Sequence, residues 1–217
     1  MIHLYALTDH PAQLPTVHGI GASRLESAAV DSIDAIFSEV NGAANEPTEA
    51  AILAHAHVVD ELAKVNDAVL PARLARPYES EAALLGGIGD RAAQFREALE
   101  RVRGCVEMGV RVMPEAGRES ATPSGSDYMR SRLEAIRAAD SVGEELDSAT
   151  KGLTRDAICG TVGTRELVLT VAYLLRKEDA ERLPAAVGGV VAKHPDLTFV
   201  CVGPWPPYSF ALVEGAS

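Results

Sequence analysis

The stretch PEAGRESATPSGSD, residues 114–127, divides the chain into two parts. It carries almost no large apolar side chain, and such a run cannot bury enough surface to offset the entropy lost on ordering. On both sides of it, apolar residues recur at the spacings of helices and strands. The sequence therefore predicts two folded domains joined by a flexible linker at 114–127.

The N-terminal domain, residues 1–113, is predicted to mix strands and helices. A first helix begins at Thr48, whose hydroxyl can cap it, and continues with apolar residues at helical spacing. A second helix is expected at about 80–103, where the glycine-rich run 86–89 interrupts or kinks it. The strands are expected at residues 2–7, 25–40 and 105–113.

The C-terminal domain, residues 128–203, starts with a long helix. The run RELVLTVAYLL, residues 165–175, is almost continuously apolar and is therefore predicted to be a central strand. Other elements are expected as strands at 157–162 and 197–202 and a helix at 178–193. Neither half alternates strictly between strand and helix, so we expect an α+β fold. Each domain is predicted to be a small mixed or antiparallel sheet with helices on one face, a ferredoxin-like variant.

An unusual stretch, GPWPPYSF at 203–210, holds the only tryptophan of the chain among three prolines. Proline fixes φ and removes a backbone donor, so neither a helix nor a central strand is expected here. We predict that 204–217 is an extended, proline-rich tail packing on the body of the protein. The alternative is a ligand for the aromatic groove of a partner. The structural or partner-contact residues are Gly203, Pro204, Trp205, Pro206, Pro207, Tyr208 and Phe210.

Charge and composition narrow the class of protein. The formal net charge of −11 argues against nucleic-acid binding and against attraction to anionic membranes. The N-terminus lacks the basic region of a signal peptide, and no apolar run approaches the ~20 residues that span a bilayer. The three cysteines lie in apolar runs and are expected to be small buried residues in a reducing compartment. These features predict a cytoplasmic protein.

Motifs for catalysis or cofactor binding are weak or incomplete. His55 and His57 are two residues apart and point to different faces of a helix, so we expect no metal site there. The Gly19–Gly21 pair lacks the third glycine of a dinucleotide fingerprint, and neither a Walker sequence nor a Gly-x-Ser-x-Gly elbow occurs. The sequence thus predicts no catalytic, cofactor-binding or metal-binding residue.

Several segments, in their order along the chain, resemble the GvpF/GvpL accessory proteins of gas vesicle formation. The final GPWPPYSF is the most specific of them. The segments are IHLYAL (2–7), ILAHAHVVDEL (52–62), AVLPARLARPY (68–78), ALERVRGCVEMGVRV (98–112), LTVAYLLRKED (169–179) and FVCVGPWPPYSF (199–210). The resemblance implies a non-enzymatic, cytoplasmic and gas vesicle-associated protein that binds the hydrophobic shell protein and other accessory proteins during assembly. Two other functions remain open from the residues alone: a small-molecule-sensing ferredoxin-like regulator, and an enzyme without a recognisable motif.

Overall fold

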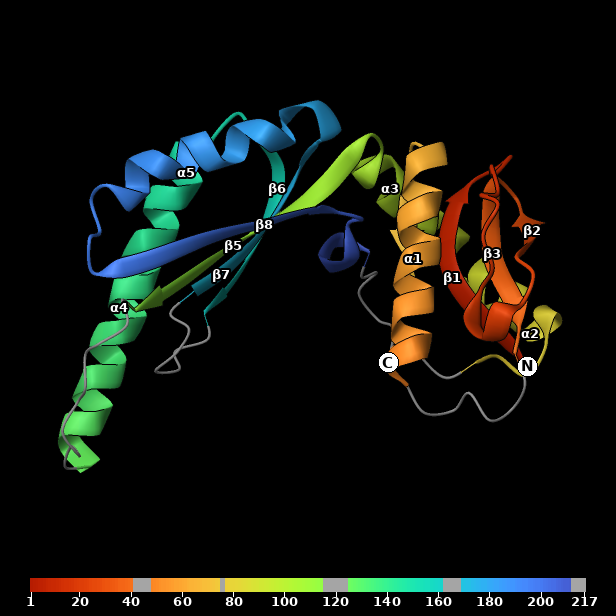
Figure 1. Ribbon diagram of the computed structural model, residues 1–217, viewed down its shortest axis with the longest axis horizontal. Helices are drawn as coiled ribbons and strands as arrows, with labels where there is room; N and C mark the ends of the chain where they lie inside the picture. Colours follow the sequence, from red (N-terminus) through yellow and green to blue (C-terminus); the bar gives the residue numbers. More distant parts are fainter. Residues whose placement is uncertain (41–47, 75–76, 115–124, 162–168, 212–217) are drawn as a thin grey trace. The chain divides into compact units, whose positions relative to one another are not determined.

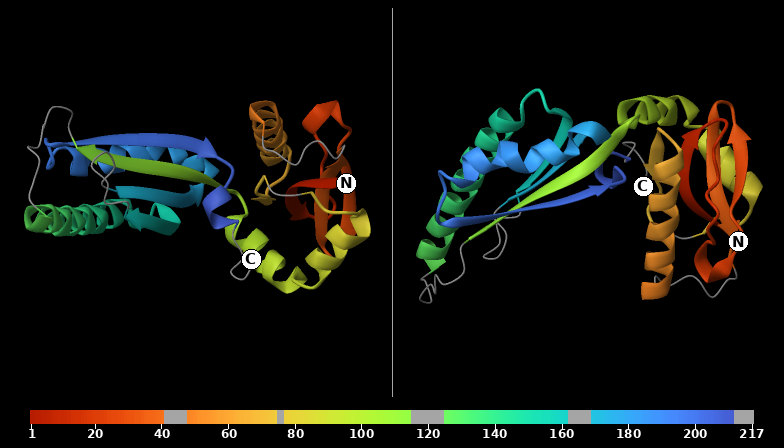
Figure 2. Two further views of the ribbon diagram at one scale, coloured as in Figure 1. Left: turned by 90° about the horizontal axis from the view of Figure 1, so that it is seen from below. Right: turned by 45° about the horizontal axis from the view of Figure 1, so that its top comes forward.

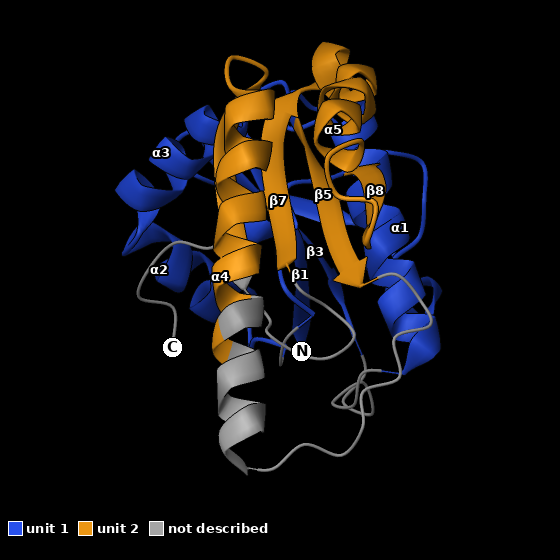
Figure 3. Cartoon of the chain, turned by 90° about the vertical axis from the view of Figure 1, so that its left-hand side faces the viewer, with its two compact units in different colours: residues 1–105, 205–217 blue, residues 106–204 orange. Residues whose placement is uncertain are grey.

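The computed structural model describes residues 1–40, 48–74, 77–114, 125–161 and 169–211. The chain forms two compact units, coloured separately in Figure 3. The first unit comprises Met1–Cys105 and Trp205–Ser217, and the second comprises Val106–Pro204. Within the described residues, none of the helices combines the length and the apolar run that crossing a membrane requires.

The first unit contains a four-stranded antiparallel sheet in the order β2-β3-β1-β4. Thr48 caps α1 as predicted, because its hydroxyl accepts a hydrogen bond from the backbone N–H of Ala51 at 3.2 Å. The predicted interruption at 86–89 is also present, since α2 ends at Gly89 and α3 begins at Ala92. The elements are β1 (Ile2–Asp9), η1 (Ile20–Ala22), β2 (Glu26–Val30), β3 (Ile33–Glu39), α1 (Glu49–Val65), β4 (Val69–Pro71), α2 (Glu81–Gly89) and α3 (Ala92–Val102).

Helices cover both faces of this first sheet (Figure 2). α1 packs on β1 and β4, whereas α3 contacts β1, β3 and β4 from the opposite side. Six consecutive residues of β3, from Ile33 to Ser38, are accordingly buried. The first unit thus differs from the prediction of helices on one face, because α2 and α3 occupy the second face.

The second unit has the ferredoxin-like order β-α-β-β-α-β along the chain. Its antiparallel strands lie in the order β6-β7-β5-β8, which makes β7 an interior strand as predicted (Figure 1). α4 and α5 pack on each other and cover one face of the sheet. The elements are β5 (Cys105–Pro114), α4 (Gly125–Thr150), β6 (Thr154–Thr161), β7 (Leu169–Arg176), η3 (Lys177–Arg182), α5 (Leu183–Val191), β8 (Leu197–Trp205) and η4 (Tyr208–Phe210).

The strand order of the first sheet, β2-β3-β1-β4, matches that of the second, β6-β7-β5-β8. In the first unit the chain between β1 and β2 is described throughout, and it contains only the short turn η1 where the second unit has α4. The two units are therefore variants of one topology, as the prediction of ferredoxin-like domains states.

Three details of the predicted organisation differ from the structure. The strand expected to end the N-terminal domain, β5, is an interior strand of the second sheet, so the units divide at Cys105–Val106. Most of the expected linker lies outside the described residues, and α4 already begins at Gly125. The expected tail is not extended throughout, because β8 continues to Trp205 and η4 forms a helical turn.

The prediction of buried cysteines holds for Cys105 and is wrong for Cys159. Cys201 is half-buried, and none of these three described cysteines forms a disulfide. Cys159 is exposed because it lies on β6, a strand at the edge of its sheet.

Candidate functional site

The motif at 203–210 is divided between the two units. Gly203, at the end of β8, has φ of +112°, a conformation that side chains with a Cβ rarely adopt. A Cβ at this position would lie 2.8 Å from the carbonyl oxygen of Glu107 and 3.0 Å from the sulfur of Met108. Glycine is therefore required here by the close approach of β5.

The second half of the motif is anchored in the first unit. Phe210 is fully buried, and Pro206 and Pro207 are buried as well. The turn η4 contacts β4, and the guanidinium of Arg101 donates a hydrogen bond of 2.5 Å to the backbone carbonyl oxygen of Phe210. The structure thus gives Phe210, rather than the tryptophan, the deepest position in the motif.

Tyr208 packs against a core cluster of the first unit that includes Val58 and Leu62 of α1. Burial, together with the nearby carboxylate of Asp60, raises the pKa of the Tyr208 hydroxyl to about 12. A tyrosine hydroxyl is neutral at physiological pH even at its ordinary pKa of 10, so the side chain contributes by packing.

Trp205 is the exposed aromatic of the motif. Its side chain is 41% exposed, and Gly203 and Pro204 before it are exposed too. The predicted motif residues therefore form two groups. Gly203, Pro204 and Trp205 are accessible at the end of β8, whereas the residues from Pro206 to Phe210 are largely withdrawn from solvent.

A buried histidine pair lies in the first unit. The Nε2 of His3 is 2.9 Å from the Nδ1 of His55, and the Nε2 of His55 is 2.9 Å from the carbonyl oxygen of Ala72. Because a carbonyl only accepts, His55 donates through Nε2 and accepts from His3 through Nδ1. Burial, and to a lesser degree the neighbouring His55, lowers the pKa of His3 to about 4, and burial also lowers the pKa of His55. Both rings are therefore neutral near pH 7.

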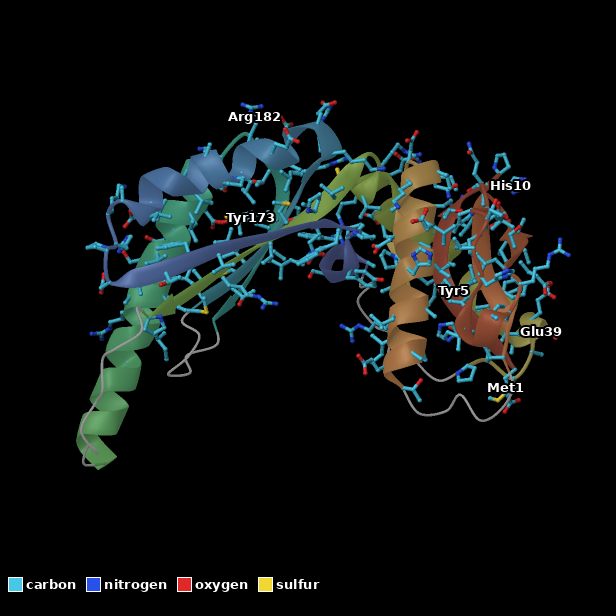
Figure 4. The ribbon with its side chains drawn as sticks, in the orientation of Figure 1. Met1, Tyr5, His10, Glu39, Tyr173 and Arg182 are labelled. Atoms are coloured by element: carbon cyan, nitrogen blue, oxygen red, sulfur yellow. The ribbon has the colours of Figure 1, made fainter. Side chains whose placement is uncertain are left out.

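Tyr5 extends this polar cluster between the first sheet and α1 (Figure 4). Its hydroxyl accepts a hydrogen bond from the backbone N–H of Ile20 at 2.7 Å and lies 2.9 Å from the Oγ of Ser38. A Cβ at Gly19 would come within 2.1 Å of the same hydroxyl. The cluster holds the chain between β1 and β2 against the sheet, and it explains the glycine at 19 without a phosphate or dinucleotide.

The two helix histidines point to different faces of α1, as predicted: His55 is buried and hydrogen-bonded, and His57 is exposed. Sequence reasoning missed His3 as the partner of His55, because the contact joins residues 52 positions apart. Among the described residues, no group of three or more His, Cys, Asp or Glu side chains is placed to hold a metal ion.

Within the described residues of the second unit, α4 and α5 lie on one face of the sheet, and neither of them covers the other face. Phe199 and Cys201 of β8 pack toward the core under α4 and α5, so Val200 between them points to the other face. Ile158 of β6 points the same way, because its partner Ala172 lies between two core residues of β7. Val200 is 36% exposed and Ile158 is 43% exposed. The face thus presents aliphatic side chains at both edges of the sheet.

Known gas vesicle proteins share this fold. The structure superposes on crystal structures of the gas vesicle protein GvpF from Anabaena and from Microcystis aeruginosa, with TM-scores of 0.80 and 0.78. The two matches cover 98% of this chain and 96% and 99% of those chains, at 16% and 14% identity. At such identities, the likeness establishes the fold.

Sequence comparison extends the relationship beyond the fold. Residues 1–212 match the family described as gas vesicle synthesis protein GvpL/GvpF, and the chain belongs to this family. Gas vesicle protein F2 of Halobacterium salinarum is 28% identical over 98% of this chain and 93% of its own length. Gas vesicle protein L of a Streptomyces species is 32% identical over 73% of this chain and 67% of its own length.

Proposed function

We propose that this chain is a non-enzymatic accessory protein that binds the hydrophobic shell protein of gas vesicles and assists vesicle assembly. The observation that carries the proposal is the family match over residues 1–212. Two relatives that share most of this chain are named as gas vesicle proteins F2 and L. Other accessory proteins of the vesicle are further partners in this proposal, and the cytoplasm is its location.

A physical need supports such a role. A shell subunit with a large apolar surface aggregates unless that surface is covered before the subunit is incorporated. A partner that covers it through a groove or a sheet edge holds the subunit in solution. The formal net charge of −11 on this chain would keep the complex soluble and discourage association between complexes.

The residues of the C-terminal motif have a structural role in this proposal. The buried positions from Pro206 to Phe210 fasten the end of the chain to the first unit, since Phe210 is fully buried and held by Arg101. Gly203 shapes the end of β8, and Trp205 remains accessible. The motif thus acts as an intramolecular clamp.

Co-expression tests the proposed function. The shell protein of the same organism is produced alone, with this chain, or with an unrelated acidic protein of similar size as the matched control. We expect the shell protein to become more soluble, and to co-purify, only with this chain. The proposal fails if the shell protein neither co-purifies nor gains solubility. Deleting the gene and scoring vesicles by electron microscopy then tests the role in the cell.

The alternative function is that of a small-molecule-sensing regulator. The ferredoxin-like order of the second unit is the one observation in its favour. A metabolite that raises the melting temperature of the purified chain would support it, because a ligand that binds the native state stabilises that state. The family match favours the assembly function.

A further inference from the structure

The first half of α1, Glu49–His55, is held on the first sheet by one buried side chain. The buried residues of the whole helix are His55, Val58, Val59 and Leu62. Before His55, Ile52 and Leu53 are 49% and 63% exposed. The other residues from Glu49 to Ala54 are exposed or half-buried. Apolar burial therefore fixes the second half of α1, whereas the first half depends on the contacts of His55.

His55 connects α1 to β1 and to the segment that follows β4. Its Nδ1 lies 2.9 Å from the Nε2 of His3, and its Nε2 lies 2.9 Å from the carbonyl oxygen of Ala72. With both rings neutral, each nitrogen of His55 makes one hydrogen bond, and His3 carries its hydrogen on Nε2. The Nδ1 of His3 then carries a lone pair.

This arrangement accepts one proton without loss of a hydrogen bond, but not two. The first proton goes to the Nδ1 of His3, and the Nε2–H of that ring still donates to His55. A second proton has to go to the Nδ1 of His55, which is the acceptor of that bond. Two N–H donors on two cationic rings would then face each other across 2.9 Å. The doubly protonated pair cannot stay in contact, so His55 has to leave its position.

The surroundings of the pair do not offset added positive charge. Tyr5 of β1 stacks on His55 with ring centroids 5.5 Å apart and meets His3 edge-on at 4.8 Å. Ser38 of β3 lies opposite His3 in the sheet register, and β4 and η1 carry no ionisable side chain. The ionisable side chains of α1 and of the segment after β4 that lie around His55 in the sequence are exposed; they are Glu49, His57, Asp60 and Arg73. Burial is accordingly the largest cause of the lowered pKa of both histidines, and no described carboxylate contributes to either shift.

We propose that the His3–His55 pair is an acid-sensitive latch, which in its neutral form holds the first half of α1 on the first sheet and on protonation releases it. The second half stays in place through its buried apolar residues, which are Val58, Val59 and Leu62. The ligand of this site is the proton, so the latch is independent of the proposed binding of the shell protein.

The direction and size of the effect follow from proton linkage. A released histidine regains its ordinary affinity for protons, so the open form binds more of them than the closed form and is favoured as the pH falls below 6.5. For His3, the pKa rises on release from about 4 to 6.5, which increases the opening equilibrium about tenfold at about pH 5.5. His55 adds to the increase, because burial lowers its pKa too. Below about pH 4 the closed form also protonates at His3, and the contribution of His3 levels off.

Hydrogen exchange on the full chain, followed by NMR at about pH 7.5 and about pH 5.5 and corrected for the intrinsic effect of pH, tests the latch. The amides of residues 53–57 donate to carbonyls in the first half of α1, whereas those of 62–65 donate to carbonyls in the second half. We expect the opening equilibrium of 53–57 to rise about tenfold or more at the lower pH, and that of 62–65 to stay unchanged. Equal rises in both halves would show that protons act on the whole unit, and no rise would show that the pair is not coupled to α1. Either result overturns the proposal.

Two variants locate the effect at the pair. In His3→Gln, the side-chain amide can still donate to the Nδ1 of His55, and after protonation of His55 it can turn and accept through its oxygen. The first half of α1 should therefore stay closed at about pH 5.5 in this variant. The matched control is His57→Gln, at an exposed position of the same helix, which should open as the wild type does. The proposal is wrong if His3→Gln opens like the wild type or if His57→Gln stays closed.

The wild-type chain offers a readout that needs no variant. Nitrogen NMR of the two rings at neutral pH should find the hydrogen on Nε2 in both His3 and His55, because the carbonyl of Ala72 only accepts. A hydrogen on the Nδ1 of neutral His55 would contradict the proposal, since that nitrogen could then not accept from His3.

Discussion

Replacing Phe210 by alanine should destabilise the first unit more than any other change in the C-terminal motif. The side chain is fully buried, and removing a buried phenylalanine costs about 3–5 kcal/mol in protein cores. Residues near the end of a chain can shift into the vacated space, so we expect a loss at the low side of this range, about 3 kcal/mol. The first unit has roughly 100 residues, and for a unit of that size this loss lowers the melting temperature by on the order of 10 °C.

Calorimetry and circular dichroism measure this change, and the transition of the first unit is the one to follow. The matched comparison is Trp205→Ala, which removes a larger aromatic side chain that is 41% exposed. Because much of the Trp205 side chain is already exposed to water, we expect Trp205→Ala to lower the free energy of unfolding by about 1 kcal/mol. The reasoning is refuted if Trp205→Ala lowers the melting temperature more than Phe210→Ala, or if Phe210→Ala leaves it unchanged.

Two further predictions concern a glycine and the buried histidines. Gly203→Ala should destabilise the second unit by about 1–3 kcal/mol in a denaturant titration, because φ is +112° and the added Cβ would meet backbone at 2.8 Å. Gly188→Ala, in a helix where nothing lies within 4 Å of the added Cβ, should instead stabilise by about 0.5–1 kcal/mol, and equal losses would contradict the argument. Acidification should weaken the first unit, because folding lowers the pKa of His3 from its ordinary value of 6.5 to about 4. The unfolded chain then binds more protons between these values, so stability is present above pH 6.5 and is lost as the pH falls toward 4. His55 acts in the same direction, since burial lowers its pKa as well. Melting temperatures at about pH 7.5 and about pH 5.5 measure the effect. Replacing His3 by glutamine should reduce the difference between the melting temperatures at these two pH values. The same change at the exposed His57 should leave that difference unchanged.

Local signals in the sequence located most helices and strands. A hydroxyl at Thr48 caps α1, and the glycines at 86–89 separate α2 from α3. The long apolar run ending at 175 became β7, an interior strand. These predictions succeed because capping, helix interruption and burial on both faces of a strand each leave a signature within about ten neighbouring residues.

Predictions that depended on long-range pairing were less accurate. β5 was expected in the first domain, since it precedes the polar stretch 114–127, but it pairs within the second sheet. The C-terminal motif was expected to pack on the body of the protein, with Trp205 and Phe210 both among its contact residues, whereas Phe210 is fully buried and Trp205 is 41% exposed. Composition identifies an aromatic motif, but how far each aromatic side chain is buried depends on the residues that pack against it in the folded chain.

The sequence by itself determined the α+β class, the positions of α1, α2, α3 and β7, and membership in a family that the ordered segments already indicated. Only the tertiary structure decided that His3 meets His55 across 52 residues and that β8 lies at the edge of its sheet. The physical reason is that caps, turns and periodicities are set by neighbours in the chain. Strand order and the burial of each side chain depend instead on which segments, distant in the sequence, pack against one another and exclude water. An uncharged strand such as β8 has the same sequence pattern whether it lies in the interior of a sheet or at its edge, and only the strand order of the folded chain decides between the two.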